Sequence, residues 1–304
     1  MESFDSFRFI DETIKRLKIG VCGDKPCHAV MLCGVEGVGK RTLAGICSRA
    51  VNCMSDGVKP CDTCDNCLQY LSDSHPDHII VKYEGKAISV AAIRQLTERL
   101  GYKPFEGGRY TVVIERADEM TVQAQNALLK TLEEPPSDAV FFLIAQNGGA
   151  LLPTIRSRCR TIRIPALTED ECGRVLAEKG FERERARTLA IVSQGSVGKA
   201  MALDSDEGYW RLRDRAIAAV AGVGEAKDIS LASSIIKDDR ASASTVIDII
   251  EQIAERMLRT GENPHGISLK PERLLEAVIL ARQMLKSNVS WQTAFERMLF
   301  AAME

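Results

Sequence analysis

Short apolar runs alternate with amphipathic segments along the first half of the chain. Runs that are apolar throughout predict strands buried on both faces of a sheet. Between these runs, apolar residues recur at three- and four-residue spacing, which predicts helices that bury one face. The expected strands are residues 29–33, 78–82, 110–114, 139–145 and 160–164. Strands that alternate with helices in this way predict a parallel sheet covered by helices on both faces, an α/β fold.

The helix predicted after the third strand shows this helical spacing clearly. The stripe consists of Met120, Ala124, Ala127, Leu128, Thr131 and Leu132. Pro135-Pro136 is expected to stop this helix, because proline cannot continue the backbone hydrogen bonding. A second helix is predicted at residues 88–100, and a third follows a glycine-rich turn after the first strand.

Strand patterns stop near residue 166, and the rest of the chain is predicted to be helical. Thr168 and Glu171 form a capping-box pattern at the start of the first helix of this part. Three short helices are expected before a polar break at residues 204–208, and further amphipathic helices after it. The predicted domains are residues 1–165 with the sheet, residues 166–206 as a small helical domain, and residues 207–304 as a second helical domain.

The composition is that of an ordinary globular protein. The 304 residues are 45% hydrophobic and 27% charged, and the net charge is −2. This balance disfavours a strongly basic nucleic-acid coat protein, although it allows a local basic face. No stretch approaches the roughly 18–20 apolar residues of a membrane helix, and the first residues do not form a secretory signal. We therefore expect a cytoplasmic protein without a membrane partner.

Residues 34–40 match the phosphate-loop pattern G-x-x-x-x-G-K between a predicted strand and a predicted helix. The glycines let backbone N–H groups surround phosphate oxygens, and the start of the helix adds partial positive charge. Lys40 is expected to reach the outer phosphates of ATP or ADP. A glycine-rich turn with a chance lysine is the weaker interpretation. The candidate nucleotide-binding residues are Gly34, Gly37, Val38, Gly39, Lys40, Arg41 and Thr42.

Two positions depart from the pattern of an ATP-hydrolysing site. Arg41 stands where a Ser or Thr hydroxyl would bind magnesium, and Thr42 is rotated away by ~100° of helix. The third strand ends in Glu115-Arg116, where an Asp followed by a Glu is expected. Glu115 could contact magnesium, but an arginine cannot be the base that activates water. We interpret Asp118-Glu119 as acids that favour the start of the next helix. Nucleotide binding is expected without efficient hydrolysis and with a weakened Mg²⁺ site.

Four of the ten cysteines lie within one short segment with the spacing C-x7-C-x2-C-x2-C: Cys53, Cys61, Cys64 and Cys67. In a reducing cytosol such a cluster favours a metal site over disulfides. Four thiolates complete a tetrahedral Zn²⁺ site without an open position, so we predict a structural zinc ion. Free or redox-active thiols are the alternative. His28 and His75 lie near these elements but are not needed as ligands.

These features together resemble one known family. A phosphate loop, this cysteine module and then His75-Pro76-Asp77 are similar to the layout of bacterial DNA polymerase III clamp-loader subunits of the AAA+ class. Residues 126–136 (NALLKTLEEPP) resemble the family's helix after the second acidic motif, and Ser157-Arg158-Cys159 resembles its SRC motif. Residues 288–300 are similar to its last collar helix, so the resemblance covers essentially the whole chain.

The resemblance implies an AAA+ parallel-sheet domain with a zinc module at residues 53–67, followed by a helical lid and an all-α collar that holds an oligomer. The family's motor subunits, gamma and tau, carry Thr or Ser at position 41 and an Asp-Glu second motif. Arg41 and Glu115-Arg116 depart from both, and Gly198 stands where a sensor arginine is expected. These departures favour the delta-prime subunit, which lacks productive ATPase action.

As a delta-prime-like subunit, the chain would help open a ring-shaped sliding clamp and place it on primed DNA, together with gamma or tau and delta subunits. The resemblance implies that Arg158, with its neighbours Ser157 and Cys159, is an arginine finger for the ATP site of an adjacent subunit. Position alone also allows a salt bridge that merely orders this loop.

Two other functions remain open at the level of sequence. One is a gamma- or tau-type motor that hydrolyses ATP, and the other is a different AAA+ machine. Arg94, Arg99 and Lys103 flank helices that could face DNA, although solvated surface charge is the simpler interpretation.

Overall fold

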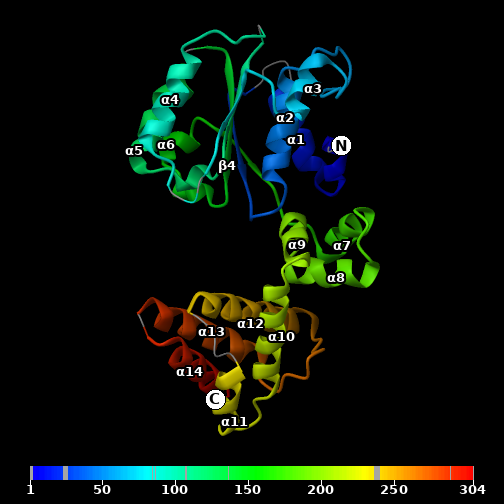
Figure 1. Ribbon diagram of the computed structural model, residues 1–304, viewed down its shortest axis with the longest axis vertical. Coiled ribbons are helices and arrows are strands. Elements are labelled where there is room, and N and C mark those ends of the chain that lie inside the picture. Colours follow the sequence, from blue (N-terminus) through cyan, green and yellow to red (C-terminus); the bar gives the residue numbers. More distant parts are fainter. Residues whose placement is uncertain are drawn as a thin grey trace. The chain divides into compact units, whose positions relative to one another are not determined.

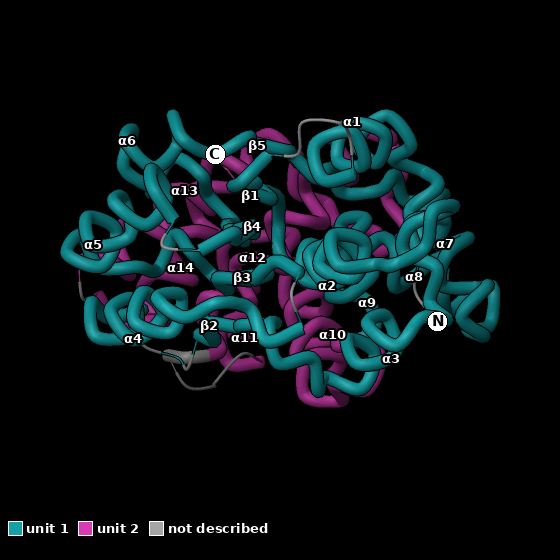
Figure 2. The backbone as a smooth tube through the Cα atoms, turned by 90° about the horizontal axis from the view of Figure 1, so that it is seen from above, with its two compact units in different colours: residues 1–201 teal, residues 202–304 magenta. Residues whose placement is uncertain are grey.

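The structure is a computed structural model that describes residues 3–22, 27–83, 85, 87–106, 108–135, 137–235, 240–287 and 289–303. The chain divides into two compact units, residues 1–201 and residues 202–304 (Figure 2). Residues 166–206, expected to be a separate small domain, fall almost entirely within the first unit. The division into three domains therefore stays a prediction.

A five-stranded sheet forms the centre of the first unit, and all of its neighbouring strands are parallel. The predicted strands are confirmed, two of them one residue shorter at the end. In spatial order they are β2 (His78–Val81), β3 (Tyr110–Ile114), β4 (Ala139–Ala145), β1 (Ala29–Cys33) and β5 (Arg160–Arg163). β2 and β5 lie at the two edges, and each buries a single residue, Ile79 and Ile162, whereas the three central strands are buried at every residue.

Helices cover both faces of this sheet (Figure 1). On one face lie α1 (Asp11–Cys22) and α2 (Lys40–Val51), and on the other α4 (Val90–Leu100), α5 (Val122–Glu133) and α6 (Pro153–Arg156). Alternate residues of each central strand enter different cores, because successive side chains point to opposite faces. In β4, for example, Phe141 and Leu143 pack with α4 and α5, and Phe142 and Ile144 pack with α1 and α2.

Side-chain caps explain where two of these helices begin. Ser89 Oγ accepts a hydrogen bond from Ala92 N at 3.3 Å before α4, and Thr121 Oγ1 accepts one from Ala124 N at 3.1 Å before α5. Met120, expected within this helix, instead follows the short 3-10 turn η2 (Ala117–Glu119) and packs into the same core. α5 ends before the proline pair as predicted, although Pro136 itself lies outside the described residues.

The three short helices of the predicted lid are present and complete the first unit. They are α7 (Glu169–Glu178), α8 (Arg183–Val192) and α9 (Val197–Asp204). The capping box is confirmed, since Glu171 N donates to Thr168 Oγ1 at 3.3 Å and Thr168 N donates to the Glu171 carboxylate at 2.9 Å. The sequence did not predict α1, the N-terminal 3-10 segment η1 (Phe4–Ile10) or α3 (Asp65–Leu71).

The described part of the second unit is helical. It consists of α10 (Glu207–Ala221), α11 (Asp228–Ile235), α12 (Arg240–Thr260), α13 (Pro271–Lys286) and α14 (Trp291–Met303). The predicted stripes of α12 and α14 form its core, with Ile250 and Phe295 almost fully buried. Asn288, the first residue of the segment compared with a collar helix, lies outside the described residues. Within the described ranges, no helix has the length and apolar character to cross a membrane.

Candidate functional site

The predicted phosphate loop connects β1 to α2 and is closely covered by two other segments. Gly37 and Gly39 have φ angles of 78° and 90°, which side chains rarely adopt. A Cβ atom on Gly37 would lie 2.4 Å from Ser196 Oγ, and one on Gly39 would lie 2.6 Å from a ring carbon of Phe7. Glycine is therefore required at both positions by backbone conformation and by the lack of space.

Lys40 lies at the base of the loop and is 7% exposed. Its Nζ atom donates to the carbonyl oxygens of Gly34 at 2.6 Å and Val35 at 2.7 Å. Burial lowers the pKa of Lys40, while the nearby carboxylates of Asp118 and Glu36 act in the opposite direction. The side chain is thus held within the loop, where the phosphate-loop pattern requires it.

The two residues that depart from the hydrolytic pattern contact each other. Arg41 Nε lies 2.9 Å from Glu115 Oε1, which joins the start of α2 to the end of β3. The Arg41 side chain is 67% exposed and that of Glu115 only 15%. A guanidinium group therefore lies beside Glu115, the carboxylate that could contact a magnesium ion.

The neighbouring charges are also paired or hydrogen-bonded. Asp118 Oδ2 accepts hydrogen bonds from the N–H groups of Gln146 and Asn147, both at 2.9 Å, so this carboxylate anchors the end of β4. Asp118 and Glu119 also lie in the first turn of the next helical segment, the 3-10 turn η2. Arg116 contacts Glu36 at 3.6 Å, and its guanidinium lies 4.9 Å from the centre of the Tyr83 ring.

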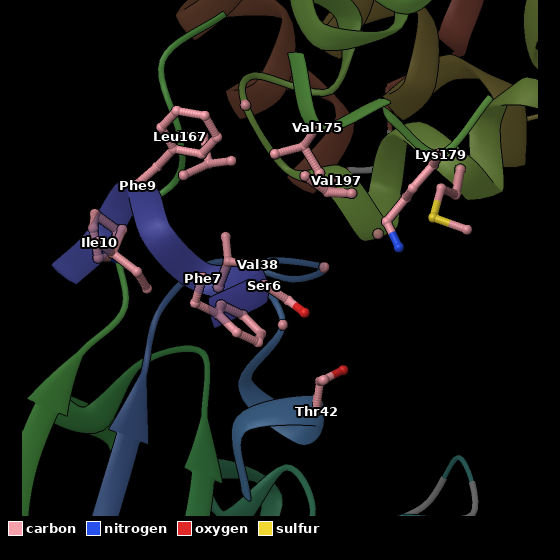
Figure 3. A pocket seen from close by; sticks show the side chains of 16 residues that line it. Ser6, Phe7, Phe9, Ile10, Val38, Thr42, Leu167, Val175, Lys179 and Val197 are labelled. Carbon is pink, nitrogen blue, oxygen red and sulfur yellow. The ribbon is translucent and has the colours of Figure 1, made fainter. Parts of the chain in front are cut away.

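A cavity of about 230 Å³ lies between the phosphate loop, η1 and the lid helices (Figure 3). Its wall is largely apolar, with Phe7 and Phe9 from η1, Val38 from the loop, and Val175 and Val197 from the lid. Thr42 lines it as well, on the side of α2. The sequence did not predict the contribution of η1, although the spacing of apolar residues in FDSFRFI is a signal for a helical turn.

The start of α9 is bonded directly to the tip of the loop. Gly198 N donates to Gly37 O at 2.8 Å, and Ser196 Oγ donates to Glu36 O at 2.7 Å. A Cβ atom on Gly198 would lie 2.8 Å from the carbonyl oxygen of Gly37, so no side chain fits at this position. This explains why glycine, rather than an arginine, follows Gly195-Ser196-Val197 here.

Arg158 lies between α6 and β5, within the predicted SRC motif. Its guanidinium forms an ion pair with Glu133 at the end of α5 and donates to Thr154 O at 2.9 Å. Ser157 Oγ also donates to Thr154 O, at 3.1 Å, whereas Cys159 is buried. The salt bridge that the sequence allowed is therefore present.

Arg158 and the phosphate loop belong to opposite ends of the parallel sheet. Arg158 directly precedes β5, whose first residue, Arg160, pairs with Val30 in β1. The loop begins only after Cys33, where β1 ends. Because β1 and β5 run in the same direction, the arginine approaches the start of the strands and the loop follows their end.

The four predicted cysteines come together after α2, and the last of them, Cys67, lies within α3. Their Sγ atoms all lie within 4.8 Å of one another, and Cys53 and Cys67 are buried. Tetrahedral zinc–sulfur bonds of ~2.3 Å place sulfur atoms just under 4 Å apart, so this cluster could hold such an ion. Hydrogen bonds from Thr63 and from Cys64 N lower the pKa of Cys61 to about 6, whereas burial raises the pKa of Cys67. His28 and His75 are not part of the cluster.

A buried polar network attaches this cluster to the sheet. Asn52, which precedes Cys53, donates from Nδ2 to the Tyr70 hydroxyl at 2.9 Å and to Arg109 O at 2.7 Å. The Tyr70 hydroxyl lies 2.7 Å from Thr111 Oγ1 in β3, and burial raises the pKa of Tyr70 to about 12. Sequence reasoning missed this network because its members are far apart along the chain.

Two of the three charged residues considered for DNA contact, Arg94 and Arg99, lie on α4, and Lys103 follows this helix. Arg99 donates to Pro76 O at 2.7 Å, and Tyr110 donates from its hydroxyl to Lys103 O at 3.2 Å. Arg94 is exposed on α4. A role in DNA binding stays a prediction for these three residues.

Residues 10–168, more than half of the chain, match the profile of the family described as "DNA polymerase III, delta subunit". The chain belongs to this family. The matched region of the delta-family chain contains the phosphate loop, the cysteine cluster and Arg158, and it ends where the lid begins. Sequence relatives include the DNA polymerase III subunit delta' of Bacillus subtilis (strain 168), which is 33% identical over 194 residues, 64% of this chain and 59% of that protein.

The delta' subunit of Escherichia coli (strain K12) is 34% identical over 198 residues, which are 64% of this chain and 59% of that protein. Subunit tau of the same strain is 30% identical over 238 residues, 76% of this chain but 35% of that protein. The delta-family chain therefore aligns with less than two thirds of the length of these relatives. Most of the described features nevertheless fall in the aligned family region.

Among solved structures, a variant of RuvB from Thermotoga maritima superposes with a TM-score of 0.50 at 16% identity. The superposition covers 97% of this chain and 87% of that one. This likeness concerns the fold, and it agrees with the AAA+ architecture expected for a delta-family chain.

Proposed function

We propose that the chain is a delta-prime-like subunit of the bacterial sliding-clamp loader. It would help load the ring clamp onto primed DNA, in a hetero-oligomer with gamma or tau and delta subunits. Support comes from the family match over residues 10–168 and from the delta' relatives at 33% and 34% identity. The helical second unit would be the collar through which the subunits associate.

The placement of Arg158 is the observation that carries this proposal. Arg158 and the chain's own phosphate loop lie at opposite ends of the sheet, so the arginine cannot reach a nucleotide in that loop. A phosphate contact made by Arg158 would have to involve a second subunit. On that reading the ion pair with Glu133 positions the guanidinium until the phosphate of a neighbouring ATP replaces the carboxylate.

The chain's own loop would bind ATP or ADP without efficient hydrolysis. Arg41 and Glu115 are 2.9 Å apart, so the carboxylate that could coordinate magnesium is already paired with a cation. Arg116 cannot remove a proton from water. Both properties oppose a motor role.

The cysteine cluster would hold a structural Zn²⁺ ion. Four sulfur ligands leave no coordination position for a substrate, and the network through Asn52 and Tyr70 couples the cluster to β3. The ion would therefore contribute to the folding of this module rather than to chemistry.

The alternative function is that of a gamma- or tau-type motor. The observation in its favour is the match to subunit tau, which covers 76% of the chain. Hydrolysis of ATP by the isolated chain separates the two functions. We expect no magnesium-dependent hydrolysis above that of the K40A variant, whose loop lacks the buried lysine. Hydrolysis that K40A abolishes would establish the motor and contradict the delta-prime-like assignment.

A further inference from the structure

The phosphate loop poorly fits the magnesium ion that usually accompanies a nucleotide there. Magnesium prefers oxygen ligands in near-octahedral geometry. Of the nearest candidates, Glu115 is paired with Arg41 and Asp118 Oδ2 accepts two backbone N–H groups, whereas Asp118 Oδ1 is buried without a hydrogen-bond partner. Thr42, the only hydroxyl residue in the following turn, lines the cavity instead. A divalent cation beside Glu115 would also lie next to the Arg41 guanidinium, which repels it.

The charges around the loop balance without a metal ion. Three cations, Lys40, Arg41 and Arg116, lie near three carboxylates, Glu36, Glu115 and Asp118. Arg41 is the more accessible member of the Arg41–Glu115 pair, because its side chain is 67% exposed and that of Glu115 is 15% exposed. A guanidinium group has five N–H donors, and the contact with Glu115 joins Nε, at one edge of the group. The outer Nη groups have the geometry that binds phosphate oxygens.

The remainder of the site fits a nucleotide. The loop adopts the glycine-dependent conformation, Lys40 is buried beneath it, and the cavity of about 230 Å³ offers an apolar wall of Phe7, Val38 and Val197. Such a wall suits a flat base, while the backbone N–H groups at the start of α2 suit phosphate oxygens. The site therefore fits a nucleotide better than it fits the magnesium ion that usually accompanies one.

We propose that Arg41 takes the place of the divalent cation, so that the loop binds a nucleoside diphosphate or triphosphate without magnesium and does not hydrolyse it. Glu115 is then a positioning residue, because its carboxylate holds the guanidinium at the end of β3. This binding is a property of the isolated chain. It does not depend on the clamp-loader assignment or on Arg158.

Calorimetric titration of the full chain with ADP, once in excess EDTA and once in excess Mg²⁺, tests the proposal. We expect binding in both buffers, with dissociation constants that agree within about threefold. The R41A variant should bind ADP in EDTA about 10- to 100-fold more weakly, as expected for a lost charge-assisted contact. R211A is the matched control, because Arg211 is also an exposed arginine in an ion pair, with Glu207 at 3.3 Å.

The E115Q variant separates the two possible roles of the carboxylate. If Glu115 only holds Arg41, E115Q changes ADP binding by the same factor in EDTA and in Mg²⁺. If Glu115 coordinates magnesium, E115Q weakens binding in Mg²⁺ alone, which overturns the proposal. Absence of ADP binding, a tenfold or greater strengthening by Mg²⁺, or an unchanged affinity of R41A would also overturn it. None of these results bears on whether the chain assembles with clamp-loader subunits.

Discussion

Arg41 and Glu115 are best understood together, because they form an ion pair with each other. Taken singly along the sequence, each is a substitution that weakens a magnesium site. In the structure they form one ion pair across the gap between α2 and β3, with Nε and Oε1 2.9 Å apart. The sequence predicted the loss of function at each position. It could not predict the pair, because nothing in the local pattern relates two residues this far apart.

For Arg158, in contrast to Arg41 and Glu115, the sequence already offered the observed interaction as one of two alternatives. The sequence left a finger and a salt bridge as alternatives, and the ion pair with Glu133 is present. The two are compatible, since an exposed ion pair contributes only ~0–1 kcal/mol and can be exchanged for a phosphate. In an assembly, the partner of Arg158 depends on whether a neighbouring subunit offers a phosphate group.

His78 provides a prediction on stability at this scale. Burial lowers the pKa of His78, and its Nδ1 atom lies 2.9 Å from Thr111 Oγ1. The carboxylate of Asp73 opposes this shift, whereas the ring of His75 adds to it. The native fold therefore favours the neutral ring, whereas the unfolded chain takes up a proton below pH ~6.5. We expect the free energy of unfolding to fall as the pH decreases through that value.

Urea unfolding at a series of pH values, for the native chain and for H78N, measures this contribution. Asparagine keeps a hydrogen-bonding group near Thr111 but does not titrate. The native chain should lose more stability than H78N between about pH 7.5 and pH 5.5. Parallel curves for the two proteins would contradict the assignment to His78.

At the scale of elements, apolar runs predicted the sheet well because its central strands are buried on both faces. β1, β3 and β4 are buried at every residue. Two helices, α1 and α3, were not predicted. In α1 the apolar residues Ile14, Leu17 and Val21 recur at helical spacing, so its signal was present but was not used. α3 has only seven residues and buries Cys67 and Tyr70, which is too short a pattern to predict a helix.

The contact between α9 and the phosphate loop also lay beyond sequence analysis. Gly198 was recognised only as a missing sensor arginine. Its N–H group instead donates to Gly37 O at 2.8 Å, and a Cβ atom there would collide with the loop backbone. The lid helix and the loop therefore require glycine on both sides of one contact.

The zinc module gives the prediction that belongs to this scale. We expect about one zinc ion per chain in the purified protein, and close to none in the C64S variant, which loses one of four ligands. Because the ion would contribute to folding, C64S should also unfold at a temperature several degrees lower.

C22S is the matched control, since Cys22 is exposed and lies outside the cluster. Elemental analysis and thermal unfolding measure both quantities. A native chain without zinc, or a C64S variant with full zinc content, would show that the thiols are not a metal site.

At the scale of the whole molecule, the chain is two compact units, and each core cluster of the described residues lies within one of them. The loop, the cysteine cluster and Arg158 all belong to the first. The second, in its described residues, consists of helices around an apolar core, as the stripes at residues 246–257 and 291–302 predicted. The fold class thus followed from patterning, and the family from motif order. The separation of residues 166–206 from the sheet domain stays a prediction, and Ser196 and Gly198 of this segment contact the phosphate loop.

The proposed function requires that this chain complete an ATP site on a neighbouring subunit. ATP hydrolysis by a gamma-type partner, measured alone and with the native, R158A or R156A chain, tests this requirement. Arg156 is the control because it is an exposed arginine of α6, two residues away. Native and R156A chains should stimulate the partner equally, and R158A should lower the rate at the shared site by on the order of 10³ while its thermal unfolding is unchanged. Equal stimulation by a folded, assembled R158A chain would contradict the account.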